Sequence, residues 1–222
     1  MRLLPGQYAS YDAPSTEWIA RYAGIRPEDV VRFDGNTSPR PPPYATPDAL
    51  VGELARIHTY PHGGYPRIAE AIAEYAGDTA RDLIEDDVIV IRTFSKAFAL
   101  AGARVGYALA GREVAEELNR RQHPAPLSTL SVALALAALE QPPDVAPIVA
   151  ERERLAEELR RIGLDPWPSR ANFLYVPLDG AEEVGERLLR RGLPVRRLPG
   201  AIRVTIRNQP DDDRLVAALR ST

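Results

Sequence analysis

The chain has 222 residues, of which 45% are hydrophobic and 27% are charged, and its formal net charge is −3. These values are ordinary for a globular protein, and the length suits one domain or a medium domain with a small one. The absence of cysteine excludes disulfides, thiol nucleophiles and zinc–cysteine sites. Neither a basic block nor a long apolar run stands out, so we expect a cytoplasmic protein that binds neither nucleic acid nor a membrane.

The first part of the chain is expected to be irregular and proline-rich, with short helices. Residues 15–23 should form a helix, because "APSTE" supplies an N-cap pattern. The run "RPPPYATP" at 40–47 cannot be a helix or a central strand, since proline lacks the amide donor. Helical periodicity then appears over residues 48–58 and 65–75.

A change of pattern at residue 88 predicts the first strand. The continuous β-branched run "VIVI" at 88–91 favours a strand buried on both faces. "ARVGYALAG" at 103–111 predicts a second, short strand. The helices expected after it span residues 112–121, 127–140 and 144–162.

The last part of the chain changes to short alternating elements. "NFLYVPL" predicts a strand and residues 181–191 a helix. "LPVRRL" and "IRVTIR" predict two further strands, and residues 211–220 a final helix. Together these elements predict a compact α+β unit of roughly 70 residues, separable from what precedes it.

Lys96 is the only lysine among the 28 Lys and Arg residues of the chain, and it follows the first predicted strand in "RTFSK". Arginine stays charged at neutral pH, whereas lysine can lose its proton and act as a nucleophile or base. Ser95 and Arg104 add a hydroxyl and a bidentate phosphate ligand at a strand end, where α/β sheets bind ligands. The alternative explanation is chance in an arginine-rich composition.

The segment "TFSKAFALAGARVGYALA" resembles the lysine motif of the fold-type I, pyridoxal-phosphate-dependent aminotransferases. Its form is typical of histidinol-phosphate aminotransferases. "VVRFDGNTSPRPPP" is similar to that family's asparagine-containing entry segment, and "YPHGGYPRIAEAIAEYAG" to its Tyr-Pro segment and following helix. "ANFLYVPL" and "LPVRRLPGAIRVTI" extend the resemblance towards the end of the chain.

The resemblance implies an α/β fold, that of a pyridoxal-phosphate-dependent transferase of fold type I, with a shortened large domain and a C-terminal α+β small domain. The expected parts are an N-terminal arm at 1–45, the large domain at 46–145 and the small domain at 146–222.

Pyridoxal 5′-phosphate is the cofactor that the resemblance implies. Lys96 would bind it covalently and act as the catalytic base, while Ser95, Thr93 and Arg104 would hold its phosphate. Tyr60 would reach the phosphate of the partner subunit's cofactor, which implies a homodimer.

The resemblance also suggests substrate-binding residues. Asn172 and Arg203 match groups that bind the substrate α-carboxylate, and Arg196 matches the group that meets the distal, phosphate-bearing end. Asn36, in the entry segment, is a further candidate. The implied enzyme transfers an amino group from histidinol phosphate or an aromatic amino acid to 2-oxoglutarate, in histidine or other amino-acid biosynthesis.

After "EYAG" at 74–77 the chain departs from the family, which has a long central block at this point. That block carries the Asp that protonates the cofactor ring and a Tyr, and the alignment places Ala69 and Ile72 at their positions. Either the protein itself lacks this block through an internal deletion, or the protein contains the block and the printed sequence leaves those residues out. The alternative function is therefore a non-catalytic remnant that folds or dimerises without turnover.

Other polar clusters have ordinary structural interpretations. His58 and His62 have metal-ligand spacing, but proline between them breaks the helix that would align them. The acidic runs at 85–87 and 211–213 precede a strand and start a helix, where acidic residues suit the dipole. We therefore expect no metal site. Arg207 stands where the family usually has a glycine.

Overall fold

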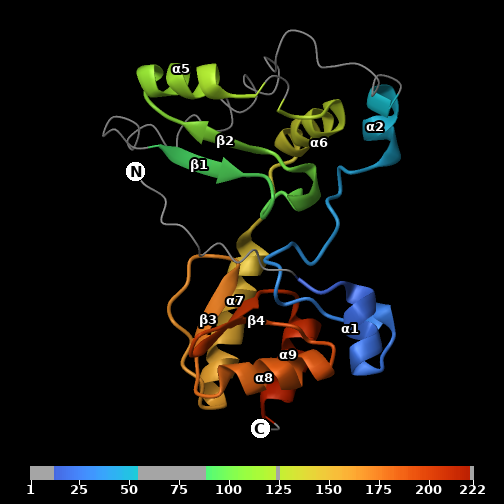
Figure 1. The fold of residues 1–222 in the computed structure, drawn as a ribbon, viewed down its shortest axis with the longest axis vertical. Helices are drawn as coiled ribbons and strands as arrows, with labels where there is room; N and C mark the ends of the chain where they lie inside the picture. Colours follow the sequence, from blue (N-terminus) through green and yellow to red (C-terminus); the bar gives the residue numbers. More distant parts are fainter. Residues whose placement is uncertain (1–12, 55–88, 124–125, 221–222) are drawn as a thin grey trace. The chain divides into compact units, whose positions relative to one another are not determined.

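The computed structural model describes residues 13–54, 89–123 and 126–220 (Figure 1). The chain forms two compact units, one made of Met1–Asn36 with Ala146–Thr222 and the other of Thr37–Val145. Within the described ranges, none of the helices has both the length and the apolar character needed to cross a membrane. The three-part division with boundaries after residues 45 and 145 stays a prediction.

A three-stranded antiparallel sheet is the centre of the first unit. β3 (Phe173–Pro177) pairs with β5 (Ala201–Thr205), and β5 pairs with β4 (Arg196–Leu198), so the strand order is β3-β5-β4. These strands confirm the three that were predicted for this part of the chain. Their bounds differ slightly from the predicted runs: β3 lacks the first and last residue of its run, β4 lacks the first three, and β5 begins one residue earlier and ends two residues earlier.

Helices pack against one face of this sheet, and they are α7 (Ala146–Arg161), α8 (Ala181–Arg190) and α9 (Gln209–Arg220) (Figure 1). Alternation along a strand sends every second side chain to the same face. The strand side chains buried against the helices are Leu174, Val176, Ile202 and Val204. Burying an aliphatic side chain of this size contributes about 1.5–3 kcal/mol, so this core accounts for much of the unit's stability.

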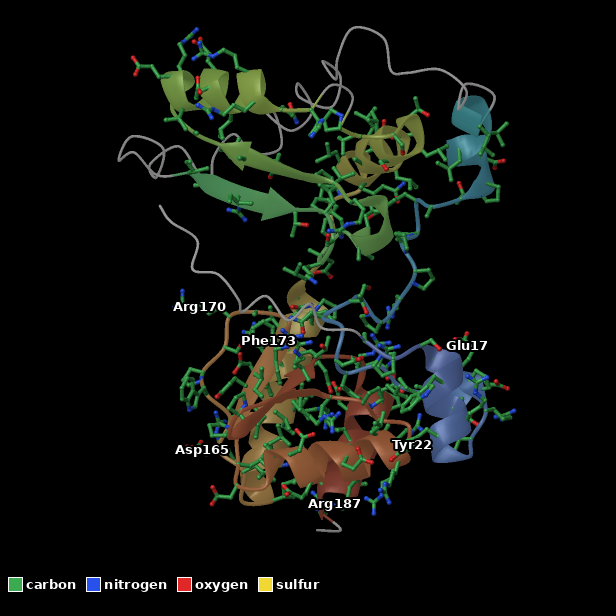
Figure 2. The ribbon with its side chains drawn as sticks, in the orientation of Figure 1. Glu17, Tyr22, Asp165, Arg170, Phe173 and Arg187 are labelled. Atoms are coloured by element: carbon green, nitrogen blue, oxygen red, sulfur yellow. The ribbon has the colours of Figure 1, made fainter. Side chains whose placement is uncertain are left out.

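The predicted N-terminal helix is confirmed as α1 (Thr16–Ala23), which packs on the first unit. Ser15 is its N-cap, and the Ser15 hydroxyl accepts a hydrogen bond from the Trp18 amide at 3.1 Å. Tyr22 lies on the side of α1 that faces α8, and its hydroxyl donates to the Glu186 carboxylate (Figure 2). The N-terminal segment is therefore part of this unit's packing.

After α1 the chain forms a short 3-10 helix at Pro27–Asp29, and backbone hydrogen bonds then hold the segment that leads to Asn36. The Val31 amide donates to the Gly192 carbonyl at 2.9 Å, and the Phe33 amide donates to the Pro194 carbonyl at 3.0 Å. The Thr205 amide in turn donates to the Phe33 carbonyl at 2.9 Å. These bonds place the residues that follow Phe33 beside the end of β5.

The second unit contains a two-stranded antiparallel sheet, with β1 (Val90–Thr93) paired to β2 (Gly106–Leu109). Its helices are α2 (Pro47–Leu54), α5 (Arg112–Arg121) and α6 (Thr129–Glu140). The buried apolar side chains of this unit form one cluster, made of Tyr44, Phe94, Phe98, Leu100, Val105, Ala135 and Ala138.

The prediction that the strand at 88–91 is buried on both faces is wrong. β1 begins at Val90, and the side chains of Ile91 and Ile89 are 78% and 44% exposed. A strand is buried on both faces only inside a larger sheet that is covered on both sides. Among the described residues β1 pairs with β2 alone, so its apolar run has no such cover. The helix predicted at 65–75 and the end of the helix predicted at 48–58 lie outside the described residues.

Candidate active site

The segment between β1 and β2 is a compact loop that carries Lys96. Phe94 and Phe98 are buried on either side of this lysine, and their rings stack with centroids 4.7 Å apart. The Phe94 amide donates to the Val105 carbonyl and the Leu100 amide donates to the Phe94 carbonyl, both at 3.0 Å. Lys96 is exposed between these anchors. The packing thus fixes the loop, while Lys96 remains an exposed residue.

Two hydroxyl groups stand directly before Lys96. The Thr93 hydroxyl donates to the Ser95 hydroxyl at 2.9 Å and accepts a hydrogen bond from the Ser95 amide at 3.0 Å. Thr93 is exposed and Ser95 is buried. The turn that follows the strand therefore gathers two hydroxyls and an amine within four residues.

Arg104 closes the loop on its other side. Its guanidinium is exposed, and Nη1 donates to the Ala101 carbonyl at 2.8 Å. Ala99 and Arg104 both have left-handed backbones, with φ of 56° and 55°. For a residue with a side chain this conformation costs about 1–2 kcal/mol, and such strain is concentrated at functional sites. Two hydroxyls, an amine and a guanidinium in one strained loop suit a ligand with a phosphate and a reactive carbonyl.

Asn36 is held at the end of β5 in the first unit. It is buried and has a left-handed backbone with φ of 48°. The Asn36 amide donates to the Thr205 hydroxyl at 2.9 Å, and that hydroxyl donates to Asn36 Oδ1 at 2.7 Å. Asparagine tolerates this conformation better than most residues. The position of Asn36 is therefore fixed from both its main chain and its side chain.

Asn172 and Arg203 both donate to carbonyl groups of the segment that contains Asn36. Asn172 Nδ2 donates to the Asn36 carbonyl at 3.1 Å, and Arg203 Nη2 donates to the Asp34 carbonyl at 3.0 Å. The Arg203 guanidinium also lies 5.3 Å from the centre of the Phe173 ring, a cation–π distance. The structure thus brings Asn36, Asn172 and Arg203 together.

Arg196 belongs to the same sheet, because it is the register partner of Arg203. It is partly buried. Arg32 contributes a further cation, since it forms two hydrogen bonds of 2.8 Å to the Asp34 carboxylate, whose side chain is 0% exposed. The cluster therefore combines the guanidinium groups of Arg32, Arg196 and Arg203 with the buried Asp34 carboxylate, which also attracts the Arg207 guanidinium.

The predicted site residues fall into two groups. The loop of the second unit holds Thr93, Ser95, Lys96 and Arg104, and the first unit holds Asn36, Asn172, Arg196 and Arg203. Further positions named from the sequence lie outside the described residues, and they are Tyr60, Ala69, Ile72, His58, His62 and the acidic run at 85–87. Among the residues that are described, no three His, Cys, Asp or Glu side chains lie close enough to hold a metal ion.

Sequence reasoning missed two residues of this cluster, Thr205 and Asp34. Thr205 is two positions after Arg203 on β5, so strand alternation places the two on the same face. Asp34 is two positions after Arg32 in an extended segment, and the same alternation brings their side chains together. The sequence contained one signal that could have identified both residues, namely a polar residue two positions after an arginine.

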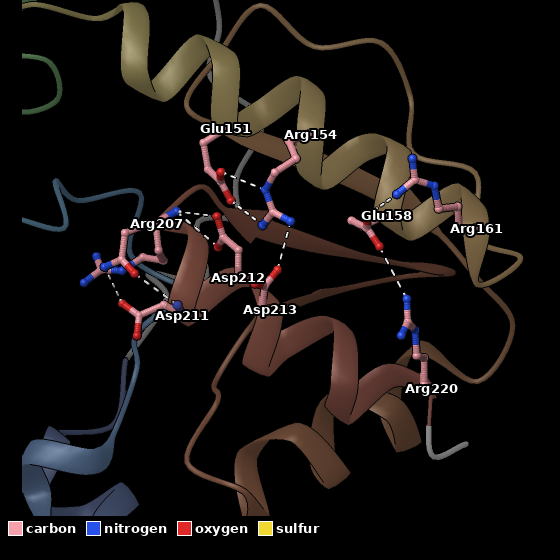
Figure 3. Close-up of polar contacts among 10 residues, drawn as sticks. Glu151, Arg154, Glu158, Arg161, Arg207, Asp211, Asp212, Asp213 and Arg220 are labelled. Atoms are coloured by element: carbon pink, nitrogen blue, oxygen red, sulfur yellow. Dashed lines mark hydrogen bonds and ion pairs between the residues drawn. The ribbon is translucent and has the colours of Figure 1, made fainter.

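A second polar network lies just beyond β5 and joins α7 to α9 (Figure 3). The Arg207 amide donates to both carboxylate oxygens of Asp212 at 3.3 Å. Arg154 of α7 pairs with Glu151 at 2.7 Å and with Asp213 of α9 at 2.9 Å. Asp211 and Asp212 lie in the first turn of α9, as the sequence interpretation expected, and Asp213 in addition joins α9 to α7 through Arg154.

Burial dominates the electrostatics of this network. Burial of Asp212, followed by its hydrogen bond with Glu151, raises the pKa of the Asp212 carboxyl to about 8. Burial also lowers the pKa of the Arg207 guanidinium, against the opposing effect of Asp211 and Asp212. Arg207 is not among the described residues with positive φ, so its backbone does not need the glycine usual at this position.

Comparison with known proteins gives these two groups a context. The family model described as aminotransferase class I and II matches residues 53–219. The histidinol-phosphate aminotransferase of Caldanaerobacter subterraneus subsp. tengcongensis is 39% identical over 165 residues, which cover 69% of this chain and 47% of that protein. The histidinol-phosphate aminotransferase 1 of Dechloromonas aromatica is 35% identical over 218 residues, covering 90% of this chain and 59% of that protein.

Solved structures agree on the fold. The histidinol-phosphate aminotransferase of Sinorhizobium meliloti, solved in complex with pyridoxal-5′-phosphate, aligns with a TM-score of 0.77 at 18% identity, over 96% of this chain and 95% of that chain. The chain itself spans about half the length of the first curated relatives it matches. From the match over residues 53–219 and this shared fold, the chain belongs to the class I and II aminotransferase family, with the architecture of fold type I.

Proposed function

We propose that the protein is a pyridoxal-phosphate-dependent aminotransferase of the histidinol-phosphate type. The observation that carries this proposal is the loop between β1 and β2, which presents the chain's only lysine beside two hydroxyls and a guanidinium. Family membership and relatives named histidinol-phosphate aminotransferase support it.

The residues of this loop fit the cofactor by their chemistry. Thr93, Ser95 and Arg104 supply hydroxyl and guanidinium donors for its phosphate, and Lys96 supplies the amine that bonds to its aldehyde. Bound pyridoxal phosphate would supply a carbonyl that condenses with amines and a ring that withdraws electrons from the adjacent carbon. Lys96 Nζ would take the proton from the substrate Cα and return it later in the reaction.

The cluster in the first unit fits a carboxylate-bearing substrate. Arg203 and Asn172 have donors suited to an α-carboxylate, and Asn36 holds the amide of Asn172 in place. Arg196, one strand further along the sheet, would meet a distal anionic group. The donor substrate would be histidinol phosphate or an aromatic amino acid, and the acceptor a 2-oxo acid such as 2-oxoglutarate.

The working form would be a homodimer in the cytoplasm. Tyr60 would reach the phosphate of the cofactor bound by the partner subunit, so each site would need a second copy of the chain. The family assignment supports this assembly, because aminotransferases are typically homodimers.

A second candidate function is a remnant that folds or dimerises without turnover. The observations that favour it are the exposure of Ile91, at 78%, and the match to only about half the length of the curated relatives. A shortened large domain would lack part of the surface that packs on the cofactor ring. The remnant would still react with the cofactor aldehyde through Lys96.

Borohydride reduction of the protein mixed with pyridoxal phosphate, followed by peptide mass spectrometry, tests the first candidate. We expect the added mass on Lys96 in the wild-type chain and none at this position in Lys96→Ala or Lys96→Arg. Lys96→Arg is the matched control because it keeps the positive charge and removes the nucleophilic amine.

Formation of glutamate from 2-oxoglutarate with histidinol phosphate or phenylalanine as donor separates the two candidates. The aminotransferase forms glutamate and loses this activity in both Lys96 variants. If Lys96 is labelled but no glutamate forms, the remnant is the candidate that remains. A wild-type chain without label would exclude both the aminotransferase and a remnant that reacts with the cofactor.

A further inference from the structure

Thr205 connects the end of β5 to the segment that carries Asn36. It is 0% exposed, and its hydroxyl both accepts from the Asn36 amide at 2.9 Å and donates to Asn36 Oδ1 at 2.7 Å. Asn36 is held in a left-handed conformation, with φ of 48°. A residue with a side chain adopts that conformation only against a steric cost. Two hydrogen bonds to one buried hydroxyl offset this cost and select a single orientation of the Asn36 peptide.

That orientation is transmitted to the side chains expected to bind substrate. The Asn36 carbonyl accepts from Asn172 Nδ2 at 3.1 Å, and two residues earlier the Asp34 carbonyl accepts from Arg203 Nη2 at 3.0 Å. A second constraint acts on Asp34, because Arg32 holds its buried carboxylate with two 2.8 Å hydrogen bonds. The backbone between Asp34 and Asn36 is thus the common support of Asn172 and Arg203.

Asn172 and Arg203 each have more hydrogen-bond donors than the one that contacts the backbone. A side-chain amide nitrogen has two N–H donors and a guanidinium has five. One hydrogen bond to a backbone carbonyl orients each side chain, and that bond by itself does not use up the donors of either group. A binding group that is already oriented loses less conformational entropy when its ligand arrives.

We propose that Thr205 is a positioning residue for the substrate carboxylate, acting through Asn36 on Asn172 and through the adjoining backbone on Arg203. The inference rests on the proposed function, because it concerns the substrate of that reaction. Thr205 itself does not touch the substrate. Its hydroxyl sets the geometry of the groups that do.

Thr205→Val tests the hydroxyl, since valine has nearly the same shape but makes neither hydrogen bond. In the cofactor-loaded protein we expect KM for 2-oxoglutarate to rise about tenfold, which is the effect of about 1.4 kcal/mol of lost hydrogen bonding. We expect kcat to change much less. Thr205→Ser keeps the hydroxyl and should retain the wild-type KM.

The choice of amino donor distinguishes positioning from general damage. Phenylalanine carries the α-carboxylate, whereas phenethylamine is the same molecule without it and has no other anionic group. In single-turnover reactions without acceptor, Thr205→Val should weaken the apparent binding of phenylalanine about tenfold and that of phenethylamine much less. Equal weakening of both donors would overturn the proposal, as would an unchanged KM in a folded Thr205→Val protein.

A measurement without turnover separates this inference from the proposed function. Calorimetric titration of the cofactor-free chain with 2-oxoglutarate should show weaker binding by Thr205→Val than by the wild type or Thr205→Ser. Hydrogen exchange should show faster exchange of the Asn36 amide in the valine variant. If the wild type forms no glutamate but these differences are present, the proposed function fails and the role of Thr205 stands.

A second pair of variants covers the case in which Thr205→Val does not fold. Asn36→Gly keeps the left-handed backbone and the hydrogen bond from its amide, and loses only the side-chain acceptor. Asn36→Ala loses the acceptor and strains the backbone. We expect binding of 2-oxoglutarate to weaken more in Asn36→Ala than in Asn36→Gly, and equal affinities in these two variants and the wild type would overturn the inference.

Discussion

Asp212 is fully buried, yet its carboxyl group lies beside a second carboxyl, that of Glu151 on α7 (Figure 3). The Arg207 amide donates to it, and Arg154 contributes a nearby positive charge. Burial is the largest influence, and it favours the neutral acid over the carboxylate. Burial therefore favours a protonated Asp212, which hydrogen-bonds with Glu151 within the interface between α7 and α9.

Asp212→Asn should remove a pH dependence of stability. Because the pKa of Asp212 is raised to about 8, the folded chain keeps a proton that the unfolded chain releases near its ordinary value of 3.8. The free energy of unfolding should then fall as the pH rises from about 4 to about 8, by up to about 1.4 kcal/mol per pH unit. Asparagine is neutral throughout, so its variant should lack this decline.

Urea unfolding of the two proteins between about pH 5 and about pH 8 measures this difference. Asp165→Asn is the matched control, because the Asp165 side chain is 95% exposed. Parallel pH profiles for the wild type and Asp212→Asn would show that Asp212 is ionised in the folded chain.

At the scale of elements, the sequence predicted the features that depend on residues close together in the chain. The runs "NFLYVPL" and "IRVTIR" predicted β3 and β5. The side chains that these strands bury recur at every second position, and they are Leu174 and Val176 on β3 and Ile202 and Val204 on β5. The hydrogen bonds between Asn36 and Thr205 join positions 169 residues apart. No local pattern encodes such a pairing, so the resemblance could supply Asn36 as a candidate but not its support.

The wrong prediction for the strand at 88–91 has the same cause, because burial depends on residues far away in the chain. "VIVI" has the composition of a strand buried on both faces, but burial depends on which elements cover it. Ile91 is exposed because β1 has a single described strand neighbour, β2. Composition can predict a strand here, whereas its surroundings are decided by the rest of the sheet.

Gly192 is expected to control the packing of the N-terminal segment on the first unit. Its backbone is left-handed, with φ of +71°, and a Cβ at this position would overlap Ile25 Cδ1. Gly192→Ala should lower the free energy of unfolding by about 1–2 kcal/mol from backbone strain, and by about 1–3 kcal/mol more from overpacking against Ile25.

Gly24→Ala is the matched control for this change. Gly24 has a nearly identical φ of +68°, but nothing lies within 4 Å of a Cβ placed there. Its variant should show the strain without the overpacking. Urea unfolding measures both, and equal losses would mean that Ile25 moves aside without cost.

For the whole molecule, the decisive feature is an exposed apolar strand in a chain that spans about half the length of the first curated relatives it matches. The loop that carries Lys96 directly follows β1, so the exposed strand and the candidate active site are adjacent in the chain. Apolar strands with unpaired polar backbone groups readily pair with other chains. A substitution of the exposed Ile91 therefore tests whether this unit associates with other copies in solution.

Ile91→Thr should reduce self-association and leave the fold intact. Threonine keeps the β-branched shape that suits a strand, and Ile91 is 78% exposed, so the free energy of unfolding should change by no more than about 0.5 kcal/mol. Sedimentation velocity over a range of concentrations measures the associated fraction. Val51→Thr is the matched control, because Val51 is 59% exposed on the helix α2, which has no strand edge. A loss of stability above about 2 kcal/mol in Ile91→Thr would show that the strand is covered in solution, since exposed positions do not lose that much.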